Sequence, residues 1–329
     1  MGTDTTMNVL RGACARILTA LGLDSRRLAR RLRANGNRLV LVLHRVLPSE
    51  ADGDLSPAGM VLAAPRFAQL LDRLGDAFDL PTPERFLAGF PEPLAHPSAL
   101  VTFDDGWADV ARHAIPEMRR RSIAGVLFVS ARHVEDGALF WPERLREAAR
   151  RLGPRRFRAL GGADLPAWKD AGGWERLLTR YKEKAEKERE EILDRLERES
   201  GGPPAERRIV SWEDLRSAAA SGIEIGSHGM SHRILTRIPD EEARREIGDS
   251  RRTIGERLGT APRLFAYPNG DRSKKIKEIV REAGYAFAFS IRGTPGDRLD
   301  LPRINLHDRS VSDRQGRWSE ARLRRTLGK

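Results

Sequence analysis

Two adjacent carboxylates and two histidines are the groups in this 329-residue chain best suited to chemistry: Asp104 with Asp105, and His228 with His232. Neighbouring side chains on a strand point to opposite sides, so the two aspartates can divide their roles at a turn. One would bind a cation and the other would stay free as a base. Histidines four residues apart converge on one face of a helical turn, a spacing that metal sites often use. Two imidazoles and one carboxylate leave coordination positions open for water and substrate.

Each pair also has a simpler interpretation when taken alone. Asp104-Asp105-Gly106 is a common turn sequence, and the two histidines could lie on a capped surface helix. Both pairs, however, directly follow predicted strands, and His44 follows another. In parallel α/β folds the functional groups gather where the strands end. This shared position favours a metal site.

Apolar runs separated by amphipathic helices predict the elements that position these residues. Helices are expected around 67–74, 107–121, 240–258 (capped by Asp240) and 273–283. Strand–helix alternation indicates a parallel sheet covered by helices, in a barrel or an open arrangement. The expected strands are 39–43, 99–103, 124–129, 223–226, 264–267 and 285–290.

A helical insertion is expected at 141–208, where no strand pattern is found. Its centre, 174–199, is a helix with mixed charges, which is usually a solvated face, and Gly201-Gly202-Pro203-Pro204 ends it. We therefore assign it no chemistry.

The motif 102–106 followed by the pair His228 and His232 resembles the first two motifs of the polysaccharide deacetylases, carbohydrate esterase family 4. Segment 265–270 resembles the third motif in the variant of bacterial exopolysaccharide deacetylases, and segments 43–46 and 139–141 match that branch too. The resemblance implies an α/β fold, a distorted and incomplete (β/α) barrel with a helical insertion. It divides the chain into a basic amphipathic helical segment (1–37), the barrel (38–308, insertion 141–208) and a basic tail (309–329).

The same resemblance implies a metal-dependent N-deacetylase. Asp105, His228 and His232 would hold a divalent metal, most often zinc, and Asp104 would be the base that activates water. The substrate would be an N-acetylated sugar of a cell-envelope polysaccharide, or a lipid-linked precursor of it. Tyr267 and Asn269, in the loop after the third-motif strand, would contact the substrate and its oxyanion.

The chain departs from the family pattern in the third and fourth motifs, and the identity of its general acid is open. Ala266 stands where the third motif has the arginine that orients the catalytic aspartate, and the fourth motif is not recognisable in 292–301. Expelling an amine requires a proton donor, and a histidine is the natural one near neutral pH. His307, in a sequence like the fifth motif, and His44 are equal candidates for this acid, each at the exit of a predicted strand.

Positive charge is concentrated at the two ends of the chain. Lys and Arg outnumber Asp and Glu by 59 to 47, yet residues 39–308 are close to neutral. A neutral middle with 3 Tyr argues against a nucleic-acid groove. The ends suit an acidic membrane surface, or they reflect coding bias and solubility. The apolar positions before residue 22 repeat at helical spacing, which predicts a helix that packs on the domain or lies on a membrane.

No secretion signal is recognised, so we expect a cytoplasmic protein, with a peripheral position at the inner membrane as an alternative. Cys14, the one cysteine, excludes a disulfide framework. A non-catalytic glycan-binding or scaffolding protein is the competing function. Degenerate members commonly lose the water-activating aspartate, and Asp104 is present, which favours the enzyme.

Overall fold

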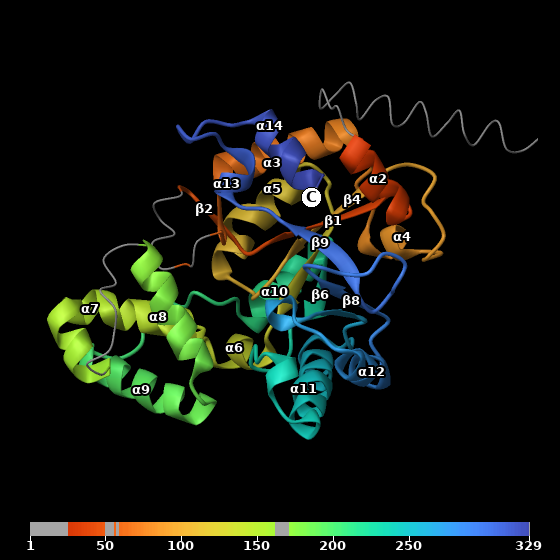
Figure 1. The fold of residues 1–329 in the computed structure, drawn as a ribbon. Coiled ribbons are helices and arrows are strands. Elements are labelled where there is room, and N and C mark those ends of the chain that lie inside the picture. Colours follow the sequence, from red (N-terminus) through yellow and green to blue (C-terminus); the bar gives the residue numbers. More distant parts are fainter. Residues whose placement is uncertain (1–25, 50–55, 57–58, 162–170, 329) are drawn as a thin grey trace, which may run out of the picture.

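Seven parallel strands close into a barrel in the computed structural model, which describes residues 26–49, 56, 59–161 and 171–328 (Figure 1). The first and last strands pair with each other, which closes the barrel. This confirms the predicted (β/α) barrel, built here from seven strands. In order around the barrel they are β1 (Arg38–Leu43), β4 (Ser98–Phe103), β5 (Gly125–Val129), β6 (Ile223–Ser227), β7 (Leu264–Ala266), β8 (Phe287–Ser290) and β9 (Leu301–Asn305).

Side chains that alternate along the strands build two apolar layers. One set fills the barrel interior, and it includes Val40, Leu100, Phe128 and Leu301. The alternate set, with Leu41 and Val101, packs outward against the surrounding helices. Burial on both faces explains why these strands are continuous apolar runs in the sequence.

The helices fall close to the predicted positions, with local differences. Helix α11 begins at Asp240 as expected, but Pro239 is its N-cap and the Asp240 side chain does not cap it. The barrel-side elements are α2 (Arg26–Ala34), α3 (Ala64–Ala77), α4 (Pro83–Leu87), the π-helix η2 (Val110–Ala114), α5 (Ile115–Arg120), α6 (Ala131–Asp136), α10 (Trp212–Ala220), η3 (Leu235–Arg237), α11 (Asp240–Leu258), η4 (Pro268–Gly270), α12 (Lys274–Glu282), α13 (Asp308–Val311) and α14 (Glu320–Leu327), with a small sheet of β2 (Arg45–Leu47) and β3 (Val61–Ala63).

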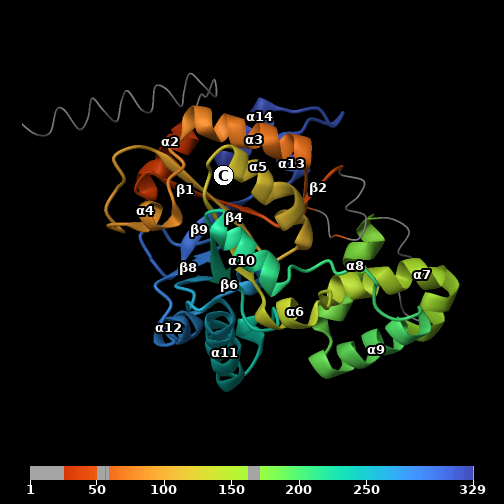
Figure 2. The same ribbon diagram turned by 180° about the vertical axis from the view of Figure 1, so that it is seen from behind.

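The insertion projects from one side of the barrel as a helical subdomain (Figure 2). Its helices are α7 (Trp141–Gly161), α8 (Ala171–Glu183) and α9 (Glu186–Glu199), so the predicted single helix over 174–199 is two helices with a break at residues 184–185. An apolar cluster of its own, including Phe157, Leu177 and Leu193, holds them together. Arg144 on α7 also pairs with Glu190, Asp194 and Glu197 on α9.

The two basic ends of the described chain meet at one end of the molecule, in both views (Figures 1 and 2). Leu28 and Leu32 of α2 share a core cluster with Leu323 and Leu327 of α14. Helix α2 therefore packs on the domain through its apolar face. The predicted helical positions before residue 22 lie outside the described residues. No helix in the described part of the chain is both long and apolar enough to cross a bilayer.

Candidate metal centre

The carboxyl ends of β1, β4 and β6 bring three sequence-predicted groups to one edge of the barrel. His44 follows β1, Asp104 follows β4, and His228 follows β6. The strands are neighbours or near neighbours in the barrel, so residues distant in sequence meet there. The structure thus brings these predicted residues together at the strand ends, as expected from the sequence.

Asp105 turns away from the direction of its strand through a left-handed backbone conformation, with φ of 74°. Gly106 continues the turn with φ of 81°. Consecutive aspartates therefore point to different partners, as the turn argument requires. The indole Nε1 of Trp107 donates a hydrogen bond to Asp105 Oδ2 at 3.1 Å, which leaves Oδ1 facing the histidines.

His228 and His232 converge through an irregular loop, and the predicted helical turn is wrong. The loop bends at Gly229 (φ 80°) and at His232 itself (φ 60°). Glu246 of α11 stabilises it, because its carboxylate accepts hydrogen bonds from the backbone N–H groups of Met230 and Ser231 and from the Ser231 hydroxyl. The convergence thus depends on left-handed residues and a buried acid.

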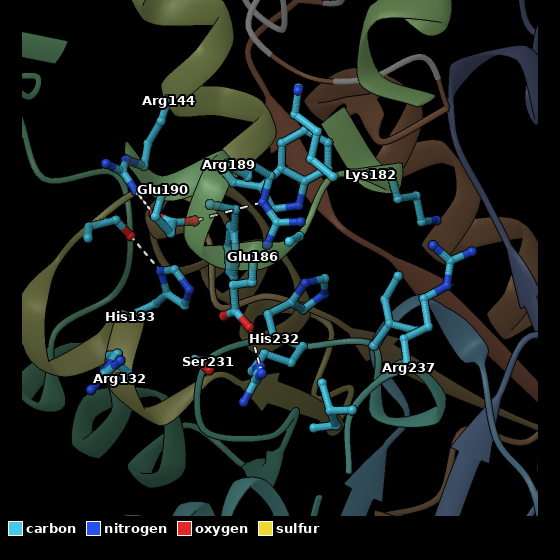
Figure 3. Close-up of a pocket in the computed structure, with 18 of the residues that line it drawn as sticks. Arg132, His133, Arg144, Lys182, Glu186, Arg189, Glu190, Ser231, His232 and Arg237 are labelled. Atoms are coloured by element: carbon cyan, nitrogen blue, oxygen red, sulfur yellow. Dashed lines mark hydrogen bonds and ion pairs between the residues drawn. The ribbon is translucent and has the colours of Figure 1, made fainter. Parts of the chain in front are cut away.

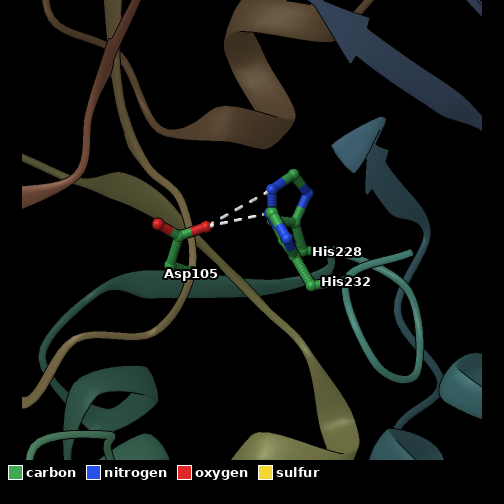
Figure 4. A group of neighbouring side chains, drawn as sticks. All are labelled: Asp105, His228 and His232. Carbon is green, nitrogen blue, oxygen red and sulfur yellow. Dashed lines mark ion pairs between the residues drawn. The ribbon is translucent and has the colours of Figure 1, made fainter. Parts of the chain in front are cut away.

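The three groups Asp105, His228 and His232 face one another with ligand atoms within 4.8 Å (Figure 4). Asp105 Oδ1 lies 3.6 Å from His228 Nε2 and 3.4 Å from His232 Nε2. Tetrahedral zinc with ligands at about 2.0–2.1 Å requires neighbouring ligand atoms about 3.3 Å apart. The observed separations fit a small divalent cation after minor adjustment.

The protonation states also fit a cation. Burial lowers the pKa of His228 to about 4, so its ring is neutral at pH 7. Its Nδ1 lies 2.7 Å from the carbonyl oxygen of Ala266 and carries the proton, so Nε2 offers a lone pair. Burial alone would raise the pKa of Asp105, but the neighbouring histidines, His232 first, hold it below its usual range. Two acceptors thus face each other, and a cation between them would satisfy both.

Asp104 is held by an arginine that the sequence did not reveal. Arg303 of β9 donates from Nη1 to Oδ1 and from Nη2 to Oδ2, each at 2.6 Å, and both side chains are buried. Burial raises the pKa of Asp104, but the charge of Arg303 opposes it and the pKa stays below its ordinary value. Ala266 stands where the third motif of the resembled family has an arginine that orients the aspartate. That departure was the one sign in the sequence that an arginine from elsewhere would hold Asp104.

The two candidate acids occupy different surroundings. His44 lies near both carboxylates, since its charge lowers the pKa of Asp104 and of Asp105. Its Nδ1 is buried and has no hydrogen-bond partner among the described residues. His307 is the N-cap residue of helix α13, and its ring faces Gly59.

The loop after β7 presents Asn269 and buries Tyr267. The Tyr267 side chain is fully buried, and its hydroxyl donates to the carbonyl oxygen of Leu299 at 2.8 Å. Asn269 has a left-handed φ of 60°, and its side-chain Oδ1 accepts a hydrogen bond from Lys182 of α8. The insertion, to which the sequence assigned no chemistry, thus contacts the candidate site.

Glu143 is a buried carboxyl group close enough to Asp105 to be affected by its charge. Burial and the charge of Asp105 raise the pKa of Glu143, in the first turn of α7, to about 8. Arg45, which pairs with Asp109 at 2.7 Å and lies over the ring of Trp107, partly opposes this shift. Sequence reasoning gave no sign of Glu143, because one acid in a charged helix is not distinctive.

A family model described as polysaccharide deacetylase matches residues 172–288. The matched residues include His228, His232 and Asn269, and they begin after Asp104 and Asp105. Chitin deacetylase 1 of Cryptococcus neoformans var. grubii is 33% identical over 78 residues, 23% of this chain. That match spans 17% of the curated relative's length.

Solved deacetylase structures share the fold at low sequence identity. IcaB from Ammonifex degensii superposes with a TM-score of 0.55 at 22% identity, over 89% of this chain and 97% of that chain. Streptococcus pyogenes deacetylase PplD, in complex with acetate, gives 0.58 at 14% identity, over 88% and 97%. The BpsB deacetylase domain from Bordetella bronchiseptica gives 0.51 at 15% identity, over 81% and 94%.

Proposed function

We propose that the chain is a member of the polysaccharide deacetylase family, whose model matches residues 172–288, and that it is a metal-dependent hydrolase that removes acetyl groups from an N-acetylated sugar. The substrate class is a cell-envelope polysaccharide or its biosynthetic precursor, including lipid-linked sugars. The observation that carries the proposal is the convergence of Asp105, His228 and His232 beside a second, separately held carboxylate. We assign the activity to the barrel of residues 38–308.

Asp105, His228 and His232 would hold the cation, with zinc the best fit to two imidazoles and one carboxylate. The ligand separations and the neutral state of His228 support this assignment. A divalent cation bound there supplies polarisation of the acetyl carbonyl and a lower pKa for water.

Asp104 is the general base in this proposal. Its carboxylate is ionised, because Arg303 keeps the pKa low, and its Oδ2 is 3.8 Å from His228 Nε2, beside the proposed ligands. The two-point pairing with Arg303 restricts its orientation. Asp104 therefore accepts a proton from water at a defined position, and Arg303 acts as its positioning residue.

We assign the general acid to His44 ahead of His307. The leaving nitrogen needs a proton as its bond to the acyl carbon breaks. His44 is close enough to Asp104 and Asp105 to lower the pKa of both, and its buried Nδ1 has no hydrogen-bond partner in the described structure. His307 is not among the groups that affect the pKa of either aspartate most strongly.

The backbone N–H of Asn269 would donate to the developing oxyanion, from the loop after β7. The Tyr267 side chain is buried and its hydroxyl donates to Leu299, so it does not reach the substrate as the sequence suggested. Tyr267 acts only by holding the start of this loop in the core.

A peripheral contact with an anionic membrane surface is part of the proposal. Helix α2 has five arginines and no acid, and α14 adds three more. None of these eight forms an ion pair with a described carboxylate, and Arg27 lies against Gly328 at the end of α14. They are Arg26, Arg27, Arg30, Arg31, Arg33, Arg322, Arg324 and Arg325. Binding to vesicles with and without anionic lipid, at low and high salt, tests this contact.

The decisive experiment is mass spectrometry of N-acetylated oligosaccharides after incubation with the zinc-loaded protein. Loss of one acetyl group by the wild type, and not by Asp104→Asn, is the expected result. Binding of the same oligosaccharides without any acetyl loss would support the non-catalytic alternative and contradict the proposal.

A further inference from the structure

A pocket of about 810 Å³ lies between the insertion and the loop that carries His232 (Figure 3). Helices α8 and α9 form one wall, and residues 231–239 with the start of α11 form the other. His232 is part of the lining, so the pocket opens onto the proposed metal centre. A glycan chain that extends from the reacting sugar can pass through this space.

Many charges that line the pocket neutralise one another. Arg233 of the barrel loop pairs with Glu186 of α9 and with Glu242 of α11, each at 2.6 Å. Arg144 pairs with Glu190 at 2.6 Å. These pairs link the helices of the insertion to one another and to the barrel. The carboxylates of Glu186, Glu190 and Glu242 are therefore already paired.

Lys182 and Arg237 differ from these paired residues. Figure 3 shows their side chains approaching each other, one from α8 and one from η3. The Nζ of Lys182 donates to a neutral amide oxygen, Asn269 Oδ1, at 3.0 Å. Within the described residues, no carboxylate pairs with either cationic group. Bringing two positive charges together is unfavourable unless an anion lies between them.

The local electrostatics agree with this geometry. Burial is the main effect that lowers the pKa of Lys182; the Asp271 carboxylate raises it, and the charge of Arg237 lowers it by a smaller amount. The Asp271 carboxylate accepts a hydrogen bond from Asn269 Nδ2 at 2.7 Å, so it is directed to that amide. Arg237 is therefore close enough to Lys182 to act on its charge, and neither cation has an ion pair with a described carboxylate.

We propose that Lys182 and Arg237 form an anion subsite that selects an N-acetylated sugar carrying an adjacent acidic group. Arginine recognises carboxylates and phosphates through paired N–H donors, and lysine adds a point charge. The acidic group is a carboxylate on the neighbouring sugar or a phosphate attached to the sugar itself. The subsite rests on the proposed function, because His232 and Asn269 connect it to the reacting centre.

Three probes test the subsite by calorimetry on the Asp104→Asn protein. They are chitotetraose, which is neutral, a hyaluronan tetrasaccharide, which has carboxylates, and UDP-N-acetylglucosamine, which has phosphates. We expect at least one acidic probe to bind about tenfold tighter than chitotetraose at low salt. The acidic probe that binds identifies the source of the anion.

Substitution of both cations, Lys182→Gln with Arg237→Gln, should remove the preference for the acidic probe. Arg132→Gln is the matched control, since Arg132 also lines the pocket and has no ion pair with a described residue. The subsite is refuted if no acidic probe is preferred, if none binds, or if the double variant keeps the preference. Deacetylation of chitotetraose by the wild type, measured in parallel, shows separately whether the proposed function holds.

Discussion

Arg303 and Asp104 form a buried two-point ion pair that joins the last strand of the barrel to the end of the second. Arg303 Nη1 also donates to Thr102 at 3.3 Å, and its guanidinium lies over the ring of Phe128. A buried charge pair is stable only when its geometry and remaining hydrogen bonds are good. This pair therefore ties the orientation of one carboxylate to the closure of the barrel.

Removing Arg303 should disturb both stability and activity. Arg303→Met leaves Asp104 buried without its partner, which is expected to cost about 3–5 kcal/mol of unfolding free energy. The pKa of Asp104 should rise, so the acidic limb of the kcat/KM profile moves to higher pH, and turnover falls by about 10²-fold. Arg303→Lys should restore part of both. An unchanged pH profile in the Met variant would contradict the positioning role.

The two aspartates should separate by experiment. Asp105→Asn is expected to lose zinc and activity together, because it removes the one carboxylate of the proposed ligand set. Asp104→Asn should keep the metal and lose about 10²-fold or more in kcat, the range for removing a general base. Metal content by atomic absorption and turnover are measured on the same samples. Wild-type turnover in Asp104→Asn would place the base elsewhere.

The histidine ligands should control metal content. We expect about one tightly bound divalent ion per chain, and His228→Ala combined with His232→Ala should abolish it with little unfolding. His96→Ala is the control, since His96 is exposed and lies outside the site. Full metal occupancy in the double variant would refute the ligand assignment.

His44 and His307 should differ in their effects on the pH–rate profile. His44→Ala is expected to lower turnover strongly, keep its metal and remove the alkaline limb, because the limb reports loss of the proton on the acid. His307→Ala serves as the comparison at a second strand end. The reverse pattern would assign the acid to His307, and no change in either would point to water as the donor.

Glu143 should make stability depend on pH. The folded protein holds this proton up to a pKa of about 8, whereas an ordinary glutamate loses it near 4.5. The folded state therefore binds more protons than the unfolded state in that interval, and the unfolding free energy falls as the pH rises through it. Since each pKa unit is worth about 1.4 kcal/mol, Glu143→Gln should be more stable than wild type above pH 8 by a few kcal/mol.

Urea unfolding of the metal-free protein at several pH values measures this difference. Glu135→Gln is a suitable control, because Glu135 is an exposed acid on α6. The prediction would be wrong if the wild type and Glu143→Gln lost stability in parallel across the interval.

The sequence predicted the three residues that the structure brings together as candidate ligands, because the positions of two of them follow from a local rule. A parallel strand ends at a polar residue, and Asp105 and His228 each come within two residues of such an end. The rule does not predict the conformation of the loop after β6, which carries His228 and His232. His232 reaches the site through a left-handed backbone angle, stabilised by Glu246 from a helix that follows later in the chain.

Contacts between distant segments were the other features that periodicity could not predict. Arg303 is one of 59 basic residues, and nothing in its neighbourhood distinguishes it until β9 is placed beside β1. Lys182 lies in a mixed-charge helix whose pattern is typical of a solvated surface, and its contact with Asn269 depends on how the insertion docks. Such pairings are set by tertiary packing.

The pairing of Asp104 with Arg303 also orders events during synthesis of the chain. All three proposed metal ligands have left the ribosome once residue 232 has emerged, whereas Arg303 follows 71 residues later. All three proposed ligands are therefore synthesised before Arg303, the residue that orients the Asp104 carboxylate. A chain that ended before β9 would contain all three proposed ligands but would lack Arg303 and the strand that closes the barrel between β8 and β1, so the proposed base would have no positioning residue.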